Sequence, residues 1–251
     1  MASNFNGIDR LAIAEISFFS ITLGGSIHLL IRHGFRRQFS WYLLACFNVL
    51  RIVGAVIRLQ SPDLTAFADP VGGALLLLTL LEILYDMNED LPDAESTWYL
   101  LFGTYITCVG ALLLAMLGFL SAAESGTIAE IGEHFIQAAA ILSMVICLVI
   151  VYIAIRMHQR PGPGHLWACT ISGLLLIVRM YFDIFAAFAP PGTGLSYHDN
   201  DVHVRIITQL GFESVAVALF IATGLLMPKV QSVDMGARTA SNDVEKQQIE
   251  R

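Results

Sequence analysis

The chain has 251 residues with a formal charge of −7; 56% of its residues are hydrophobic and only 14% are charged. Soluble domains usually contain about 45–50% apolar and about 25% charged residues, so this composition excludes a soluble enzyme and a disordered protein. The negative charge also argues against a nucleic-acid-binding protein.

Apolar stretches long enough to cross a bilayer, which takes about 20 residues, occur seven times along the chain. We place them at 11–31, 41–60, 70–87, 98–121, 133–155, 166–189 and 204–226. Backbone groups in hydrocarbon must satisfy their own hydrogen bonds, so these spans are expected to be helices. The sequence therefore predicts an all-α fold. One seven-helix transmembrane domain covers 1–227, and a disordered cytosolic tail, polar and mixed in charge, covers 228–251.

Lysine and arginine residues are distributed unevenly between the two sides of the predicted bundle. Nine lie on one side, whereas Arg10, Arg58 and Arg205 lie on the other. The side richer in these residues normally faces the cytosol, so we predict an outer or lumenal N-terminus and a cytosolic C-terminus. Aromatic residues open the even-numbered spans and predict a belt at the cytosolic interface: Trp41, Tyr42, Trp98, Tyr99 and Trp167.

Several charged residues lie inside the predicted spans, where a charge costs from about 2.5 kcal/mol upward and needs a partner or a hydrated cavity. Arg179 and Asp183 are four residues apart and therefore share one helical face. The alternating span directions gather five such charges in the outer half of the bundle: Glu15, Arg51, Arg179, Asp183 and Glu213. The short third span also contains Glu82 and Asp86, so the sequence does not define the residue at which this span ends on the cytosolic side.

This group of five charges has three interpretations. It is an interior ion-pair network that fixes helix register. Alternatively, it is a polar pocket, open to the outer leaflet, that binds the head group of an amphipathic ligand. The third interpretation is catalysis by one of the carboxylates. Arg179 beside Asp183 argues against that chemistry, because a neighbouring cation favours the ionised carboxylate over a proton-donating acid.

The sequence predicts no metal or cofactor site. An intramembrane zinc hydrolase needs three ligands at one depth, whereas His28 and His134 lie near opposite ends of the predicted bundle. The acidic run 88–95 could imitate an aspartate-rich motif that holds magnesium and a diphosphate. A second such motif is missing, so a solvated cytosolic loop is favoured. The four cysteines fall within predicted spans and are expected to be buried, reduced packing residues.

Several short motifs, taken in order and spacing, match a known family. They are Arg32-His33-Gly34-Phe35, Ser40-Trp41, Arg51-Ile52-Val53-Gly54-Ala55, Val178-Arg179-Met180-Tyr181, and Glu213 followed by Gly224-Leu225. Over most of residues 8–228 the chain resembles a family of fungal integral membrane proteins of unknown function. The resemblance implies a fungal origin, seven helices and an outward N-terminus. A fainter likeness to the fungal RTA-like lipid-translocating exporters implies a role in handling lipids or toxicants.

The favoured function is that of a multi-pass protein of the plasma membrane or endoplasmic reticulum that binds, senses or moves an amphipathic small molecule. Its expected partners are membrane lipid and a lipid-like or terpenoid-like ligand, and not nucleic acid; no oligomeric state is indicated. Two alternatives stay open. One is an integral-membrane terpene or meroterpenoid cyclase of fungal secondary metabolism, with Asp183 or Glu213 as the general acid. The other is a structural membrane subunit without a ligand.

Overall fold

The structure is a computed structural model of the whole chain, and it describes residues 7–33, 39–60, 68–89, 95–122, 127–158, 166–190 and 206–227. The backbone within these ranges is helical and contains no strand, which confirms the predicted all-α class. The predicted tail, 228–251, lies outside the described residues, as does most of the acidic run 88–95.

Seven α-helices and one π-helix follow each other along the described chain. They are α1 (Gly7–His33), α2 (Phe39–Gln60), α3 (Ala68–Glu89), α4 (Glu95–Ala122), α5 (Thr127–His158), α6 (Leu166–Phe188), the π-helix η2 (Ile206–Glu213) and α8 (Ser214–Leu226). Six of them are long and apolar enough to cross a membrane, whereas Leu210–Leu226 is a shorter apolar segment. The first six predicted spans therefore each fall on one helix, whereas the seventh falls on η2 and α8 together.

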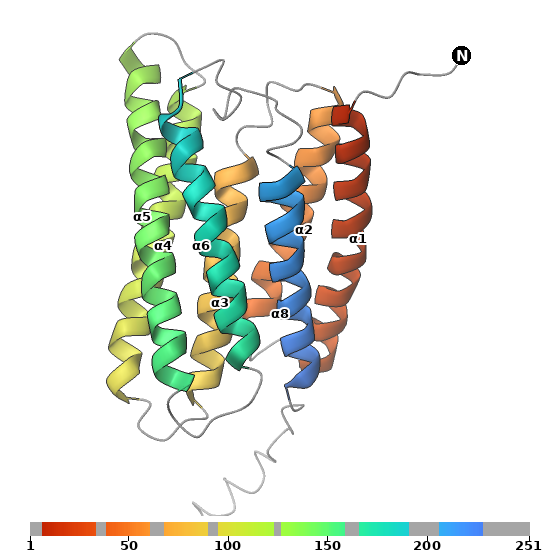
Figure 1. Cartoon of the computed structure of the whole chain (residues 1–251), viewed down its shortest axis with the longest axis vertical. Helices are drawn as coiled ribbons and strands as arrows, with labels where there is room; N and C mark the ends of the chain where they lie inside the picture. The colour runs from red at the N-terminus through yellow and green to blue at the C-terminus, as the bar shows by residue number, and fades with distance from the viewer. Residues whose placement is uncertain are drawn as a thin grey trace, which may run out of the picture.

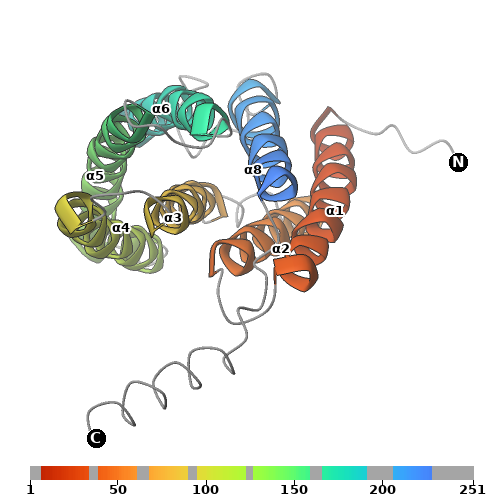
Figure 2. The same ribbon diagram turned by 90° about the horizontal axis from the view of Figure 1, so that it is seen from below.

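Helix α3 lies at the centre of the bundle. Figure 1 shows the helices running along one common axis, and Figure 2 shows α4, α5 and α6 as an arc around α3, with α1, α2 and α8 on the other side. Residues of α3 contact α2, α4, α5 and α6. In its apolar window 78% of the residues are buried, against 28–44% in the other five long helices. The middle of α3, residues 71–81, is apolar all round, as expected for a helix in such a position.

The core and the outer surface of the bundle are both apolar. The core contains a run of α3 residues, Leu76, Leu77, Leu80 and Leu81, packed against side chains of the surrounding helices. The outward faces carry large hydrophobic side chains such as Ile21 on α1, which is 76% exposed, together with many others on every long helix except α3. A surface of this kind is stable against hydrocarbon rather than water.

Two sequence-based predictions about individual residues are wrong. Trp41 does not belong to an outer aromatic belt, because it is buried, stacks on His33 and packs against Gly224 of α8. The belt prediction failed here because a position at a helix end does not reveal which side of the helix faces inward. Cys46 is exposed on α2, whereas the other three cysteines are buried; all four are free thiols.

Candidate functional site

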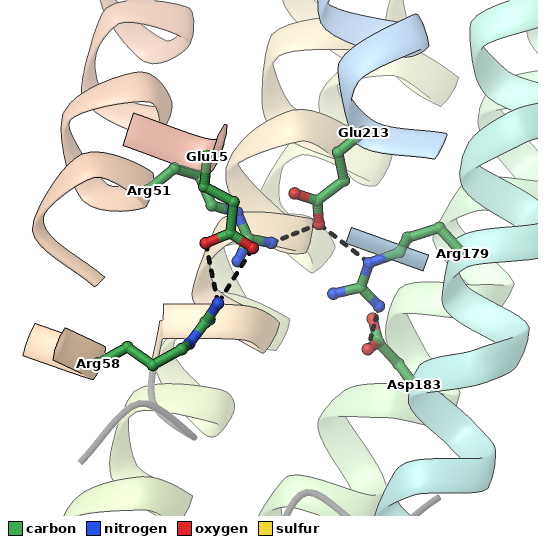
Figure 3. A network of polar contacts seen from close by, with 6 residues as sticks. All are labelled: Glu15, Arg51, Arg58, Arg179, Asp183 and Glu213. Atoms are coloured by element: carbon green, nitrogen blue, oxygen red, sulfur yellow. Dashed lines mark hydrogen bonds and ion pairs between the residues drawn. The ribbon is translucent and has the colours of Figure 1, made fainter. Parts of the chain in front are cut away.

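A chain of ionic contacts joins α2, the π-helix η2 and α6 inside the bundle (Figure 3). Arg51 Nη2 and Arg179 Nε both donate to Glu213 Oε1, the second over 2.9 Å. Arg179 Nη1 also contacts Asp183 Oδ1 one turn further along α6. Arg51, Arg179, Asp183 and Glu213 are all buried, and we call these four residues the ion-pair chain.

Local backbone structure brings the four residues together. Arg179 and Asp183 stand four residues apart on the inner face of α6, and Glu213 is the last residue of η2. A π-helix is rare and often occurs beside functional positions. Gly72 of α3 leaves room for Arg51, since a Cβ there would lie 2.9 Å from Arg51 Nη2. The glycine therefore lets the central helix pack directly against the guanidinium group.

Glu15 belongs to a second ion pair, which it forms with Arg58. Arg58 Nη1 of α2 donates to both carboxylate oxygens of Glu15 on α1, at 3.0 and 2.9 Å, and both side chains are buried. Figure 3 shows this pair beside Arg51. Arg58, which we counted from the sequence with the basic residues of the outer side, thus faces the bundle interior near the end of α2.

The charges of this region balance one another. The ion-pair chain contains two arginines and two carboxylates, and the Glu15–Arg58 pair contains one of each. Buried charges are costly to desolvate, and geometry that matches each charge to an opposite one offsets that cost. The ion-pair chain therefore fixes α2, α6 and η2 relative to one another, and the Glu15–Arg58 pair fixes α1 relative to α2.

A separate cavity of about 270 Å³ lies between α3 and α4. The described residues that line it are apolar or aromatic apart from one carboxylate: Leu81, Glu82, Tyr85, Trp98, Leu101, Phe102 and Tyr105. Trp98 and Phe102 stack on each other with ring centroids 5.2 Å apart, and both are exposed on the outer surface of α4. The cavity therefore opens sideways between two long apolar helices.

Glu82 differs from the buried carboxylates of the ion-pair chain. No hydrogen bond or ion pair joins it to another residue in the part of the chain that the structure describes. Among the described residues that line the cavity there is no lysine, arginine or histidine. Glu82 is half-buried and lies toward the α4 end of α3, whereas Gly72, beside the ion-pair chain, lies toward the α2 end. The two sites are thus in opposite halves of the bundle.

The sequence contained a signal for this cavity that the five-charge hypothesis did not use. Glu82 is an acidic residue well inside an apolar helix, which points to function in a membrane protein. Trp98, Phe102 and Tyr105 follow the i, i+4, i+7 spacing and share one face of α4. Sequence reasoning noted Glu82 only as a limit on the third span, and it assigned Trp98 only to the aromatic belt.

These features define a helical protein of multi-pass membrane character: within the described ranges, six helices are able to cross a bilayer, and buried, mutually compensated charges lie between helices. Residues 5–230 match the family described as a domain of unknown function (DUF7702), and the chain belongs to that family. A search of curated proteins gave no match. The same was true of a search of solved structures.

Proposed function

We propose that this protein is a seven-span membrane protein that binds an amphipathic small molecule in the cavity between α3 and α4. The observation that supports this proposal is the cavity itself, an aromatic chamber with one carboxylate that opens sideways from two long apolar helices. Ligand sites are typically concave and apolar, with a few polar groups that orient the ligand. A molecule with an apolar tail reaches such an opening from the bilayer.

The ion-pair chain takes a structural role in this proposal. Its arginines and carboxylates contact each other, so their charges are compensated within the protein and do not call for a charged ligand. A cyclase mechanism is disfavoured for a related reason. Asp183 and Glu213, the two candidate general acids, each contact an arginine, and a neighbouring cation favours a carboxylate over the neutral acid that a cyclase needs.

The proposed topology has η2 and α8 together as the seventh span, the N-terminus outside and the C-terminus in the cytosol. Helix α8 follows η2 without interruption, so their combined length exceeds that of the apolar segment Leu210–Leu226. With Arg58 paired inside the bundle, Arg10 and Arg205 are the remaining basic residues on the proposed outer side. A fungal origin and a location in the plasma membrane or endoplasmic reticulum complete the proposal.

Quenching of Trp98 fluorescence by bromine-labelled amphiphiles tests ligand binding at this cavity. The Trp167→Phe variant keeps Trp98 at the cavity and the buried Trp41. In phosphatidylcholine nanodiscs, we expect at least one brominated dodecyl amphiphile to quench this variant in a saturable way. The matched Trp98→Phe variant, which keeps the exposed Trp167, should show only the gradual quenching of a lipid-facing residue. Absence of saturable quenching with cationic, uncharged and anionic head groups alike would contradict the proposal.

A further inference from the structure

The carboxylate of Glu82 is the first feature that indicates the charge of the ligand. The carboxylates of Glu15, Asp183 and Glu213 each contact an arginine, whereas Glu82 has no ion pair with any residue in the described ranges. A carboxylate within an apolar span is costly unless a positive group is close to it. Because the described lining residues include no basic side chain, a cationic ligand would supply the counter-charge that the lining does not.

The aromatic walls give a second and independent indication of the same chemistry. Tyr85, Trp98, Phe102 and Tyr105 line the cavity together with Glu82. Aromatic faces attract cations, and cages of such rings recognise alkylated ammonium groups. Methyl or methylene groups on the nitrogen also suit the apolar lining. An anionic head group would be repelled by Glu82, and an uncharged one would leave the carboxylate without a counter-charge.

The size and position of the cavity indicate which part of a ligand it holds. Sites that enclose a whole drug-sized ligand are about 300–1,000 Å³, so a cavity of about 270 Å³ is suited to a head group. The exposed rings of Trp98 and Phe102 place the opening on the outer surface of the bundle. An alkyl tail would then lie along α4 in the bilayer. A zwitterionic phospholipid fits less well, because its phosphate would find no basic partner among the lining residues.

We infer that the cavity between α3 and α4 binds the ammonium head group of an amphiphile with a net positive charge, with Glu82 as the counter-ion and the rings of Trp98, Phe102, Tyr85 and Tyr105 as the surrounding cage. This inference rests on the proposed function and narrows it to one class of ligand.

The test compares three brominated dodecyl probes on the Trp167→Phe protein in phosphatidylcholine nanodiscs: a trimethylammonium, an alcohol and a sulfate. We expect half-saturation of Trp98 quenching by the ammonium at a mole fraction about tenfold lower than by the alcohol, and no saturable effect of the sulfate. Glu82→Gln should abolish the preference for the ammonium. Glu133→Gln, which removes an exposed carboxylate on α5, should leave the preference unchanged.

Each other outcome has a defined meaning. Equal saturable binding of ammonium and alcohol, or a preference that survives Glu82→Gln, would overturn the ammonium inference while leaving amphiphile binding intact. No saturable quenching by any probe would overturn both. Saturation by brominated phosphatidylcholine in place of the soluble ammonium would assign the site to a zwitterionic lipid and overturn the net positive charge. If Glu82→Gln does not fold, the Phe102→Leu variant is used in its place and should weaken the preference for the ammonium. Phe188→Leu, which removes an exposed aromatic ring on α6, is its control and should leave the preference unchanged.

Discussion

Removal of Arg179 should destabilise the bundle strongly, because this guanidinium group contacts two buried carboxylates. Arg179→Leu leaves Arg51 as the one arginine of the ion-pair chain, opposite Glu213 and Asp183, so one buried negative charge loses its compensation. Breaking a buried pair in this way costs about 3–5 kcal/mol. For a protein of this size that corresponds to a fall of roughly 6–20 °C in the unfolding midpoint. Thermal unfolding in detergent, followed by size-exclusion chromatography, measures the fall.

A second substitution distinguishes the loss of charge balance from the loss of packing. Arg179→Leu combined with Asp183→Leu removes one positive and one negative charge and retains the Arg51–Glu213 contact. We expect the double variant to recover most of the lost stability. Arg156→Leu on α5 serves as the control, since Arg156 is exposed and should change the midpoint little. A double variant no more stable than Arg179→Leu would refute the argument from charge balance.

Three further outcomes are expected. Gly224→Ala should destabilise the protein by about 1–3 kcal/mol in a detergent unfolding assay, because the new methyl group would meet Trp41 Cζ2 at 2.7 Å, whereas Gly110→Ala, with nothing within 4 Å, should not. Arg58→Met should lower the unfolding midpoint and Arg58→Met with Glu15→Leu should restore it; equal midpoints would mean that the pair is not coupled. A glycosylation acceptor at the N-terminus should be modified and a C-terminal reporter should be cytosolic; the opposite pattern would invert the proposed topology.

The helices could be read from the sequence because the signal for each is long and repeated. An apolar stretch of about 20 residues flanked by breakers allows few alternatives to a helix. The central position of α3 was harder to foresee. Glu82 and Asp86 made the end of this span uncertain in the sequence. In the structure, α3 is nevertheless the most buried of the six long helices.

The pairing of the charges depends on which face of each helix turns inward. Arg179 and Asp183 share a face by their spacing alone, and the structure places them in contact. The ion pair of Arg58 was not predicted, because a residue near a helix end can lie either at the membrane interface or against a neighbouring helix. Its contact with Glu15 depends on how α1 and α2 pack, and that packing is a tertiary property that local spacing does not determine.

The cavity was missed for a different reason. Glu82 and the aromatic stripe of α4 are each visible in the sequence, but their meeting requires α3 and α4 to be neighbours in a particular rotation. The short connection between them predicts that the helices are adjacent, and only the structure gives the rotation. A carboxylate on one helix and three rings on the next therefore became a site only when the two faces were seen together.

Photolabelling of the full-length protein with a diazirine-bearing dodecyltrimethylammonium, mapped by mass spectrometry, tests amphiphile binding between α3 and α4 without any substitution. We predict that the label concentrates on Tyr85, Phe102 and Tyr105 and is displaced by excess unlabelled dodecyltrimethylammonium. Leu174 provides an internal comparison, because it is 51% exposed on α6, against 49% for Phe102 on α4. Equal labelling of Leu174 and Phe102 that the competitor does not displace would contradict the proposal. A probe that is merely dissolved in the bilayer would label both residues in this way.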